Sequence, residues 1–178
     1  MRLLVTGGAG FIGSNFTRHV LTTSDDQMTI LDALTYAGNR ANLADLDADP
    51  RLRFVHGDIC DRELVASVMP GHDAVVHFAA ESHVDRSIVA PDAFVRTNCD
   101  GTNVLCDVAG RSEIQKFVHV STDEVYGSLD STADRFREDM PLEPTSPYAA
   151  SKASADMMVL AAFRSYGQDV IITRSSNN

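Results

Sequence analysis

The chain has few basic residues, and this scarcity excludes several classes of function. Its 178 residues include 15 Lys and Arg against 25 Asp and Glu, a formal net charge of −10. Proteins that bind nucleic acids or anionic membrane surfaces cluster Lys and Arg on one face. The composition therefore argues against a nucleic-acid or membrane partner. A phosphorylated ligand remains compatible with it, because a helix N-terminus can hold phosphate without basic side chains.

Cysteines and long apolar runs are also scarce. The three cysteines, Cys60, Cys99 and Cys106, form no Cys-x-x-Cys pair. We therefore expect free thiols and a cytoplasmic protein. The apolar run Leu3–Val5 is too short for a signal peptide or a membrane span. No His, Cys and Asp residues stand at the spacing of metal ligands, so no metal site is predicted.

What the chain does contain is a regular alternation of β-branched runs and amphipathic stretches, in a length that suits one core. Strands are predicted at Arg2–Thr6, Met28–Asp32, Leu52–His56, Ala74–His77, Lys116–Ser121 and Val170–Thr173. Helices are predicted at Phe11–Leu21, Asn39–Leu46, Arg62–Met69, Pro91–Ala109 and Pro147–Tyr166. Strands separated by helices form parallel βαβ units. We therefore predict an α/β fold, a doubly wound parallel sheet of the Rossmann type, with a polar surface loop at 127–145.

A glycine-rich turn joins the first predicted strand to the first predicted helix. It fits two spacings of a dinucleotide-binding turn, Gly8-x-Gly10-x-x-Gly13 and Gly7-x-x-Gly10-x-x-Gly13. Glycines permit the tight turn, the close approach of a pyrophosphate and close packing of helix on strand. No Gly-Lys-Ser/Thr follows, so the turn is not a P-loop. A purely structural turn is the remaining alternative.

Asp32 ends the second predicted strand, nineteen residues after Gly13. An acid at about this distance, roughly 20 residues, binds the ribose hydroxyls of NAD. It would repel the extra phosphate of NADP by roughly 1–4 kcal/mol per unit charge at contact distance. The next basic residue is Arg40, so the pattern favours NAD over NADP. The alternative is that Asp32 only caps a helix or a turn.

Tyr148 and Lys152 lie four residues apart and therefore share one face of the last predicted helix. Free tyrosine has a pKa of about 10. A nearby ammonium group and an oxidised nicotinamide ring both favour phenolate, so we expect the pKa of Tyr148 to be lowered. Tyr148 then accepts a hydroxyl proton while hydride leaves the same carbon.

Two adjacent carboxylates, Asp123 and Glu124, follow the fifth predicted strand. Ligands bind at the carboxyl ends of parallel strands. We interpret the pair as an acid and a base, the alternative being loop carboxylates that face water or cap a helix. His83 lies in a polar loop and is a candidate for substrate contact. His77 and His119 alternate with apolar residues and are predicted to be satisfied core histidines.

These segments together resemble the extended short-chain dehydrogenase/reductase superfamily and, within it, the dTDP-glucose 4,6-dehydratase family. The resemblance spans the chain and rests on residues 5–14, 34–39, 79–87, 97–98, 121–127, 146–152 and 176–178. The glycine turn and the pair Tyr148 and Lys152 are common to the superfamily. The run Thr122-Asp123-Glu124 is more specific, because the related epimerases lack this acid pair.

The glycine turn and the resemblance together imply an NAD site lined by residues from most of the chain, namely Gly7, Gly10, Phe11, Ile12, Gly13, Asp32, Asp58, Ile59, Ala79, Ala80, Thr97, Tyr148, Lys152 and Asn178. The resemblance assigns the hexose contacts to Ser82, Thr122 and Asn177. Family members are usually homodimers joined by a four-helix bundle, and the helices at 91–109 and 147–166 match its elements.

The end of the sequence bears on the domain organisation. An apolar strand at 170–174 is followed by only four residues, whereas a buried parallel strand normally continues into another connection. The family also has a carboxyl-terminal lobe that grips the nucleotide and diphosphate. We therefore expect residues 1–178 to be the NAD-binding domain, with the substrate-binding lobe outside this sequence.

The resulting hypothesis is a redox-neutral lyase that acts on dTDP-glucose. Tyr148, helped by Lys152, takes the C4 hydroxyl proton while NAD accepts the C4 hydride. Glu124 removes the C5 proton, Asp123 donates a proton to the departing C6 hydroxyl, and Thr122 polarises the 4-ketone. The hydride returns to C6 and C5 is reprotonated, which gives a 4-keto-6-deoxy sugar nucleotide. The alternatives are an NAD-dependent sugar-nucleotide epimerase or decarboxylase, and a non-catalytic NAD-binding module.

Overall fold

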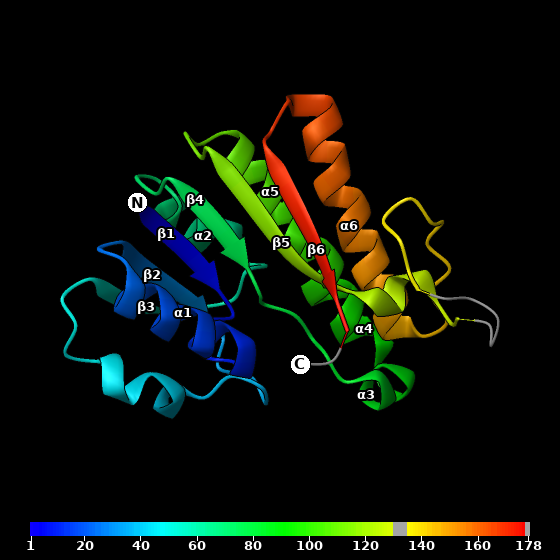
Figure 1. The fold of residues 1–178 in the computed structure, drawn as a ribbon, viewed down its shortest axis with the longest axis horizontal. Coiled ribbons are helices and arrows are strands. Elements are labelled where there is room, and N and C mark those ends of the chain that lie inside the picture. Colours follow the sequence, from blue (N-terminus) through cyan, green and yellow to red (C-terminus); the bar gives the residue numbers. More distant parts are fainter. Residues whose placement is uncertain (130–134, 177–178) are drawn as a thin grey trace.

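The computed structural model describes residues 1–129 and 135–176 and contains a six-stranded parallel sheet (Figure 1). Its order is β3-β2-β1-β4-β5-β6. The strands are β1 Arg2–Thr6, β2 Gln27–Asp32, β3 Leu52–His56, β4 Ala74–His77, β5 Lys116–Thr122 and β6 Val170–Ser175. The strand order reverses between β1 and β4, and open α/β sheets bind ligands at such a point. The predicted doubly wound fold is confirmed.

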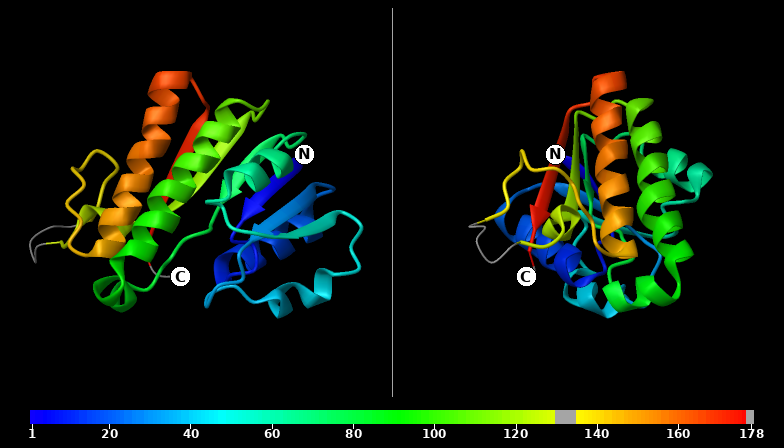
Figure 2. Two further views of the ribbon diagram at one scale, coloured as in Figure 1. Left: turned by 180° about the vertical axis from the view of Figure 1, so that it is seen from behind. Right: turned by 90° about the vertical axis from the view of Figure 1, so that its right-hand side faces the viewer.

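Helices cover both faces of the sheet, as Figure 2 shows. The described helices are α1 Phe11–Thr23, η1 Arg40–Leu46, α2 Arg62–Val68, α3 Val84–Val89, α4 Pro91–Phe94, η2 Val95–Gly101, α5 Thr102–Gly110, η3 Asp123–Tyr126 and α6 Pro147–Tyr166. α1 and η1 lie on one face, and α2, α5 and α6 lie on the other. None of these helices is long and apolar enough to cross a bilayer.

Two hydrophobic cores form because successive residues of a strand point to opposite faces of the sheet. Leu4, Val75 and Phe117 belong to the core beneath α2, α5 and α6. Leu3 and Val76 belong to the core beneath α1 and η1. Full burial of such a side chain contributes about 1.5–3 kcal/mol. The alternation therefore fixes the register of each central strand and, with it, the side chains at the strand ends.

Four helical segments differ from the sequence prediction. The single helix predicted at 91–109 is divided into α4, a π-helical η2 and α5. The π-helical turn carries Asn98, whose buried side chain bonds other elements. The helix predicted at 39–46 is a 3₁₀ helix capped by Asn39. The short helices α3 and η3 were not predicted, because helices of four to six residues carry almost no periodic signal.

The polar loop after η3 starts at Gly127, whose φ of +86° lies in the left-handed region that favours glycine. The chain returns to η3 where the Glu143 N–H donates to the Val125 carbonyl oxygen at 3.0 Å. Within the described residues of 127–145 there is neither helix nor strand. This part of the loop prediction is confirmed, and the loop leads directly into α6.

Candidate active site

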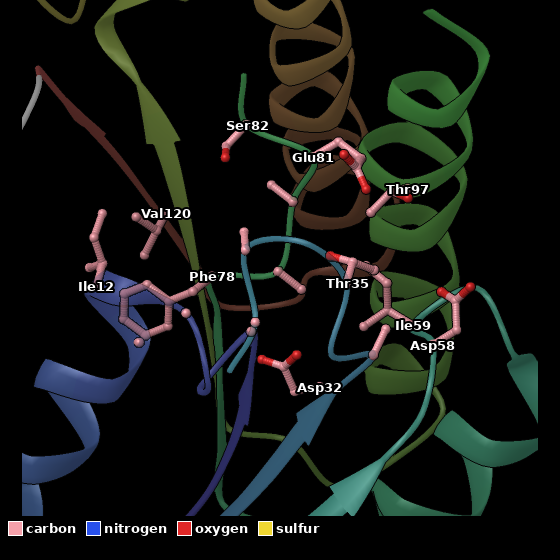
Figure 3. A pocket seen from close by; sticks show the side chains of 18 of the residues that line it. Ile12, Asp32, Thr35, Asp58, Ile59, Phe78, Glu81, Ser82, Thr97 and Val120 are labelled. Carbon is pink, nitrogen blue, oxygen red and sulfur yellow. The ribbon is translucent and has the colours of Figure 1, made fainter. Parts of the chain in front are cut away.

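A cleft of about 650 Å³ lies at the carboxyl ends of the strands around the β1/β4 reversal. In Figure 3, Asp32 lies centrally, with Asp58 and Ile59 to one side and Ile12, Phe78 and Val120 to the other. Most of the predicted site residues line this cleft, namely Gly7, Gly10, Phe11, Ile12, Gly13, Asp32, Asp58, Ile59, Ala79, Ala80, Ser82, Thr97, Tyr148 and Lys152. The structure therefore gathers side chains from six sequence segments into one elongated site.

The glycine turn forms the floor of the cleft. Gly7 has a φ of +70°, and a Cβ added to it would lie 2.5 Å from the backbone nitrogen of Ala79. A Cβ on Gly13 would collide with the Gly7 carbonyl oxygen. Gly8 packs against Ile30 and does not line the cleft. Of the two predicted spacings, Gly7-x-x-Gly10-x-x-Gly13 is the one that faces the site.

Asp32 is held in place by the backbone and is only 7% exposed. Its Oδ2 accepts from the Ala9 N–H and its Oδ1 from the Leu34 N–H, both at 2.8 Å. Each carboxylate oxygen has a further lone pair, which suits a ribose diol. Arg40, the first base after Asp32, pairs with Asp47 and does not line the cleft. The geometry fits NAD better than NADP.

Asp58 forms the far end of the cleft together with Arg96, which the sequence did not indicate. Asp58 accepts from the Cys60 N–H at 2.8 Å and from the Arg96 guanidinium at 2.8 Å. Burial opposes ionisation, but the Cys60 N–H and Arg96 outweigh it, so the pKa of Asp58 lies below its ordinary value. Asp58 is therefore an oriented, charged acceptor where the adenine end of a dinucleotide would lie.

Tyr148 and Lys152 form the opposite end of the cleft. Lys152 is 4% exposed, and its Nζ donates to the Val120 carbonyl oxygen at 2.9 Å. Burial lowers the pKa of Lys152 to about 8. Burial, and after it the charge of Glu124, raises the pKa of Tyr148 to about 12. The predicted lowering of the Tyr148 pKa is therefore wrong for the protein groups alone, because desolvation of the phenolate and the charge of Glu124 outweigh the hydrogen bond from Thr122.

The acid pair lies at the end of β5 in the short helix η3. Thr122 caps η3, accepting from the Glu124 N–H at 3.3 Å, and its hydroxyl donates to Asp123 Oδ1 at 3.4 Å. Burial, and then the charge of Asp123, raises the pKa of Glu124. The charge of Glu124 in turn raises the pKa of Tyr148. Thr122, Asp123 and Glu124 are thus beside Tyr148, although they do not line the cleft itself.

Asn98 is a site residue that the sequence reasoning missed. It is 1% exposed, and its amide bonds the backbone N–H and carbonyl of Glu81 at 2.9 and 3.0 Å. It also donates to the Ser151 hydroxyl at 2.8 Å, which donates to the Tyr148 carbonyl at 2.7 Å. Asn98 therefore clamps the cleft segment at Glu81 onto the first turns of α6. The helix predicted at 91–109 contains other polar residues, among them Asn103, so its composition does not single out Asn98.

Tyr36 connects the two sides of the cleft. Its hydroxyl accepts from the Ser82 N–H at 3.1 Å, and Arg86 lies 3.8 Å over its ring. The ring of His83 lies 5.4 Å away. We call these contacts of Tyr36 with Ser82 and Arg86 the Tyr36 bridge. It joins the loop after β2 to the segment after β4, and both flank the cleft.

The core histidines differ from each other. His77 bonds Thr6 at 2.7 Å and Thr102 at 3.0 Å, so the prediction of a satisfied histidine is confirmed. His119 has no hydrogen-bond partner within the described chain, and its Nε2 lies 3.4 Å from Asp156 Oδ1. For His119 the prediction of satisfied hydrogen bonds is wrong, because Asp156 Oδ1 at 3.4 Å lies beyond good hydrogen-bond geometry.

The predicted contacts of Asn177 and Asn178 lie outside the described residues. The predicted roles of the other site residues stay predictions, since the chain alone fixes their positions and not their ligands. What the positions show is a cleft at the β1/β4 reversal that is lined by Tyr148 and Lys152, with the acid pair beside Tyr148.

Comparison with known proteins places this arrangement in a family. The family model described as GDP-mannose 4,6 dehydratase matches residues 4–178. A dTDP-glucose 4,6-dehydratase of Streptomyces niveus is 54% identical and is matched over 100% of this chain and 54% of its own length. A crystal structure of the Streptomyces venezuelae dTDP-glucose 4,6-dehydratase with NAD bound has 59% identity and a TM-score of 0.94, over 98% of this chain and 55% of that one.

Epimerases are more distant in sequence. The UDP-glucose 4-epimerase of Thermus thermophilus, solved with NAD, has 32% identity and a TM-score of 0.86, over 98% of this chain and 54% of that one. The chain spans about half the length of the relatives that it matches. The match of the family model over nearly every residue shows that the chain belongs to the GDP-mannose 4,6 dehydratase family.

Proposed function

We propose that this chain is the NAD-binding part of a hydro-lyase that converts dTDP-glucose into its 4-keto-6-deoxy product. The observation that carries the proposal is the acid pair Asp123 and Glu124 at the end of β5, beside Tyr148 and next to a dinucleotide-shaped cleft. The similarity to dTDP-glucose 4,6-dehydratases, one of them solved with NAD, supports it. An enzyme that only oxidises a carbon does not need the acid pair.

The domain assignment is part of the same proposal. Residues 1–178 are the NAD-binding domain, supported by the cleft at the β1/β4 reversal. The relatives extend to almost twice this length, and in the length that this chain does not span we expect the lobe that grips the nucleotide and diphosphate.

The first chemical step is oxidation at C4. NAD, when bound, supplies the hydride acceptor for C4, the hydride donor for C6 and a positive ring charge that favours the Tyr148 phenolate. Tyr148 holds the C4 hydroxyl and takes its proton. Lys152 remains largely protonated at pH 7, because its pKa is about 8, and its ammonium stabilises the phenolate. Asp32 and Asp58 orient the far half of the dinucleotide.

The second step is elimination of water across C5 and C6. The 4-ketone, polarised by the Thr122 hydroxyl, acidifies the C5 proton, which Glu124 removes. Burial and Asp123 raise the pKa of Glu124 towards neutrality, where a general base is most effective. Asp123 protonates the departing C6 hydroxyl. Neighbouring carboxylates suit this division because only one of them needs to be ionised.

The test separates the two steps in the complete protein. Glu124→Gln is expected to keep C4 oxidation, seen as a single-turnover rise in NADH absorbance, and to lose elimination by about 10²–10⁴-fold. Tyr148→Phe is expected to lose both steps. Glu138→Gln, on the exposed loop after η3, is the matched control. Equal loss of oxidation and elimination in Glu124→Gln would contradict the assigned role.

The epimerase and decarboxylase alternatives share the oxidation step and differ afterwards. Incubation with dTDP-glucose in deuterated water distinguishes them, since a dehydratase incorporates deuterium at C5 and loses the C6 oxygen. A non-catalytic NAD-binding module would bind NAD in the complete protein and convert no sugar nucleotide. The intact set of Tyr148, Lys152, Asp123 and Glu124 favours the enzyme.

We also propose a cytoplasmic homodimer. The surface of α6 exposes Met157, Met158, Phe163 and Tyr166, at 46%, 41%, 52% and 75%. A groove between α5 and α6 includes Met158 and Tyr166, and exposed apolar side chains gathered on one helix are typical of an interface. Cys60, Cys99 and Cys106 are free thiols, which is the usual state in a reducing compartment.

A further inference from the structure

A buried charged cluster extends from Lys152 away from the cleft. Tyr148, Lys152 and Asp156 follow one another at intervals of four residues along α6 and therefore share a face of the helix. Tyr148 and Lys152 line the cleft, whereas Asp156 does not. Asp156 is completely buried. A buried carboxylate that touches no ligand site needs another explanation, because burial of a charge is costly unless it is paired.

Asp156 is paired with groups from the neighbouring strands. Its Oδ2 accepts from Arg174 Nε at 2.8 Å, and its Oδ1 lies 3.4 Å from His119 Nε2. Arg174 also donates to the Tyr126 hydroxyl at 2.6 Å. Asp156 thereby joins α6 to β5, β6 and η3. Its Oδ1 has no hydrogen-bond partner within the described chain. Arg174 therefore bonds only one of the two carboxylate oxygens.

The remaining groups that face Lys152 carry no charge near neutral pH. Burial lowers the pKa of His119 to about 4 and the pKa of His77 well below its ordinary value. Burial raises the pKa of Cys99 on η2. Both histidines and the thiol are therefore neutral at pH 7. Of the two side chains that act on the pKa of Lys152, Asp156 and Cys99, Asp156 is the charged one.

Asp156 itself stays ionised. Burial opposes its charge, but the contacts with His119, Ser121 and Arg174 outweigh burial, so the pKa of Asp156 lies below its ordinary value. After burial, the charge of Asp156 is the largest influence on the pKa of Lys152, and it acts to raise it. An ammonium with a single backbone acceptor is otherwise poorly stabilised in an apolar interior.

We propose that Asp156 is a positioning residue: its carboxylate, anchored by Arg174 on β6, keeps the Lys152 ammonium charged and in place beside Tyr148. The inference rests on the proposed function, in which Lys152 must be an ammonium. Asp156 reaches neither cofactor nor substrate and acts through Lys152 alone.

The experiment measures the charge of Lys152 directly. The signals are assigned in ¹³Cε-lysine NMR of the complete protein by their loss, that of Lys152 in Lys152→Met and that of Lys116 in Lys116→Arg. The chemical shift of Lys152 is followed from pH 6 to 11 in the wild type and in Asp156→Asn. We expect the midpoint of Lys152 to fall by about 1 unit or more when the opposite charge is removed. Lys116, at the start of β5, is the internal control.

Arg174→Gln separates charge from packing, because it breaks the same ion pair and leaves the carboxylate. Its Lys152 midpoint is expected to rise, because the carboxylate loses the cation that offsets its charge. An unchanged midpoint in Asp156→Asn, or equal falls in both variants, would overturn the proposal. If Asp156→Asn does not fold, Arg174→Gln still decides, since a rise there supports the proposal and an unchanged or lower midpoint contradicts it.

The measurement needs no substrate and no cofactor, so its result is independent of whether the protein is a dehydratase. Failure of the proposed function would appear instead as absent turnover in the wild type. In an active enzyme, the alkaline limb of C4 oxidation is expected to move to lower pH in Asp156→Asn and not in Arg174→Gln.

Discussion

At the scale of single residues, burial has opposite consequences for the two neighbours in the active site. It lowers the pKa of Lys152 to about 8 and raises the pKa of Tyr148 to about 12, because both neutral forms are favoured away from water. The tyrosine therefore needs more positive charge than the chain provides in order to act as a base at neutral pH. The positively charged ring of a bound NAD would supply this charge and so lower the pKa of Tyr148.

Buried neutral histidines predict a loss of stability in acid. The folded-state pKa of His119 is about 4, against about 6.5 in an unfolded chain. Between these values the unfolded chain binds more protons, so stability falls as pH decreases from about 6.5 to about 4, in total by roughly 3 kcal/mol for this group. Urea unfolding at pH 7 and pH 5 is expected to show a smaller acid loss in His119→Gln than in the wild type.

His77 contributes to the same loss of stability in acid. Its pKa is also lowered by burial, so some acid sensitivity remains in His119→Gln. An acid loss in His119→Gln equal to that of the wild type would show that His119 does not carry the effect.

At the scale of elements, the strand ends place the acceptors of the cleft and the Tyr36 bridge closes over them. The loop after β2 is held by Asp32, which bonds the Leu34 N–H, and its tip bonds Ser82 after β4. The Tyr36 bridge thus ties together two segments that line the cleft. Under the proposed function the same NAD takes and returns the hydride, so we expect these contacts to slow its release.

The bridge predicts slow release of NAD. Tyr36→Ala removes one hydrogen bond, worth about 0.5–1.5 kcal/mol, and one exposed cation–π contact, worth about 0.5–1 kcal/mol. We expect NAD to dissociate about 5–50-fold faster, measured by stopped-flow displacement. Tyr36→Phe keeps the ring under Arg86 and is expected to show a smaller increase. An unchanged rate in Tyr36→Ala would exclude the bridge as a retaining device.

Elements were predictable to different degrees. The six strands were found within one or two residues of their bounds, because β-branched runs between turn residues are a strong local signal. The division of 91–109 at η2 was not, since it accompanies Asn98, whose partners Glu81 and Ser151 are distant in sequence. A helix interrupted by a non-local hydrogen bond carries no periodic signature of the interruption.

At the scale of the whole molecule, the cleft uses one end of the sheet and leaves apolar side chains exposed on the second half of α6. The groove between these helices includes Met158 and Tyr166. Both lie away from Tyr148 and Lys152, in the second half of α6. The proposed dimer would therefore bury the apolar surface without blocking the cleft.

This surface predicts a change of oligomeric state on a single substitution. Met158→Glu is expected to shift the complete protein from dimer to monomer, because a dimer with two-fold symmetry would bury the new charge twice. Analytical ultracentrifugation measures the mass. Arg137→Glu, on the loop before α6 and exposed, is the control. A monomeric wild type would contradict the dimer, and an unaffected dimer would place its interface elsewhere.

The sequence by itself determined the sheet, the glycine turn, Asp32, the acid pair and the spacing of Tyr148 and Lys152, because each depends on neighbours a few residues away. The tertiary structure alone decided which glycine spacing faces the cleft, the raised pKa of Tyr148, the Asn98 clamp, the Tyr36 bridge and the ion pair of Asp156 with Arg174. The reason is physical: burial and pairing of a polar group depend on segments that only the folded chain brings together.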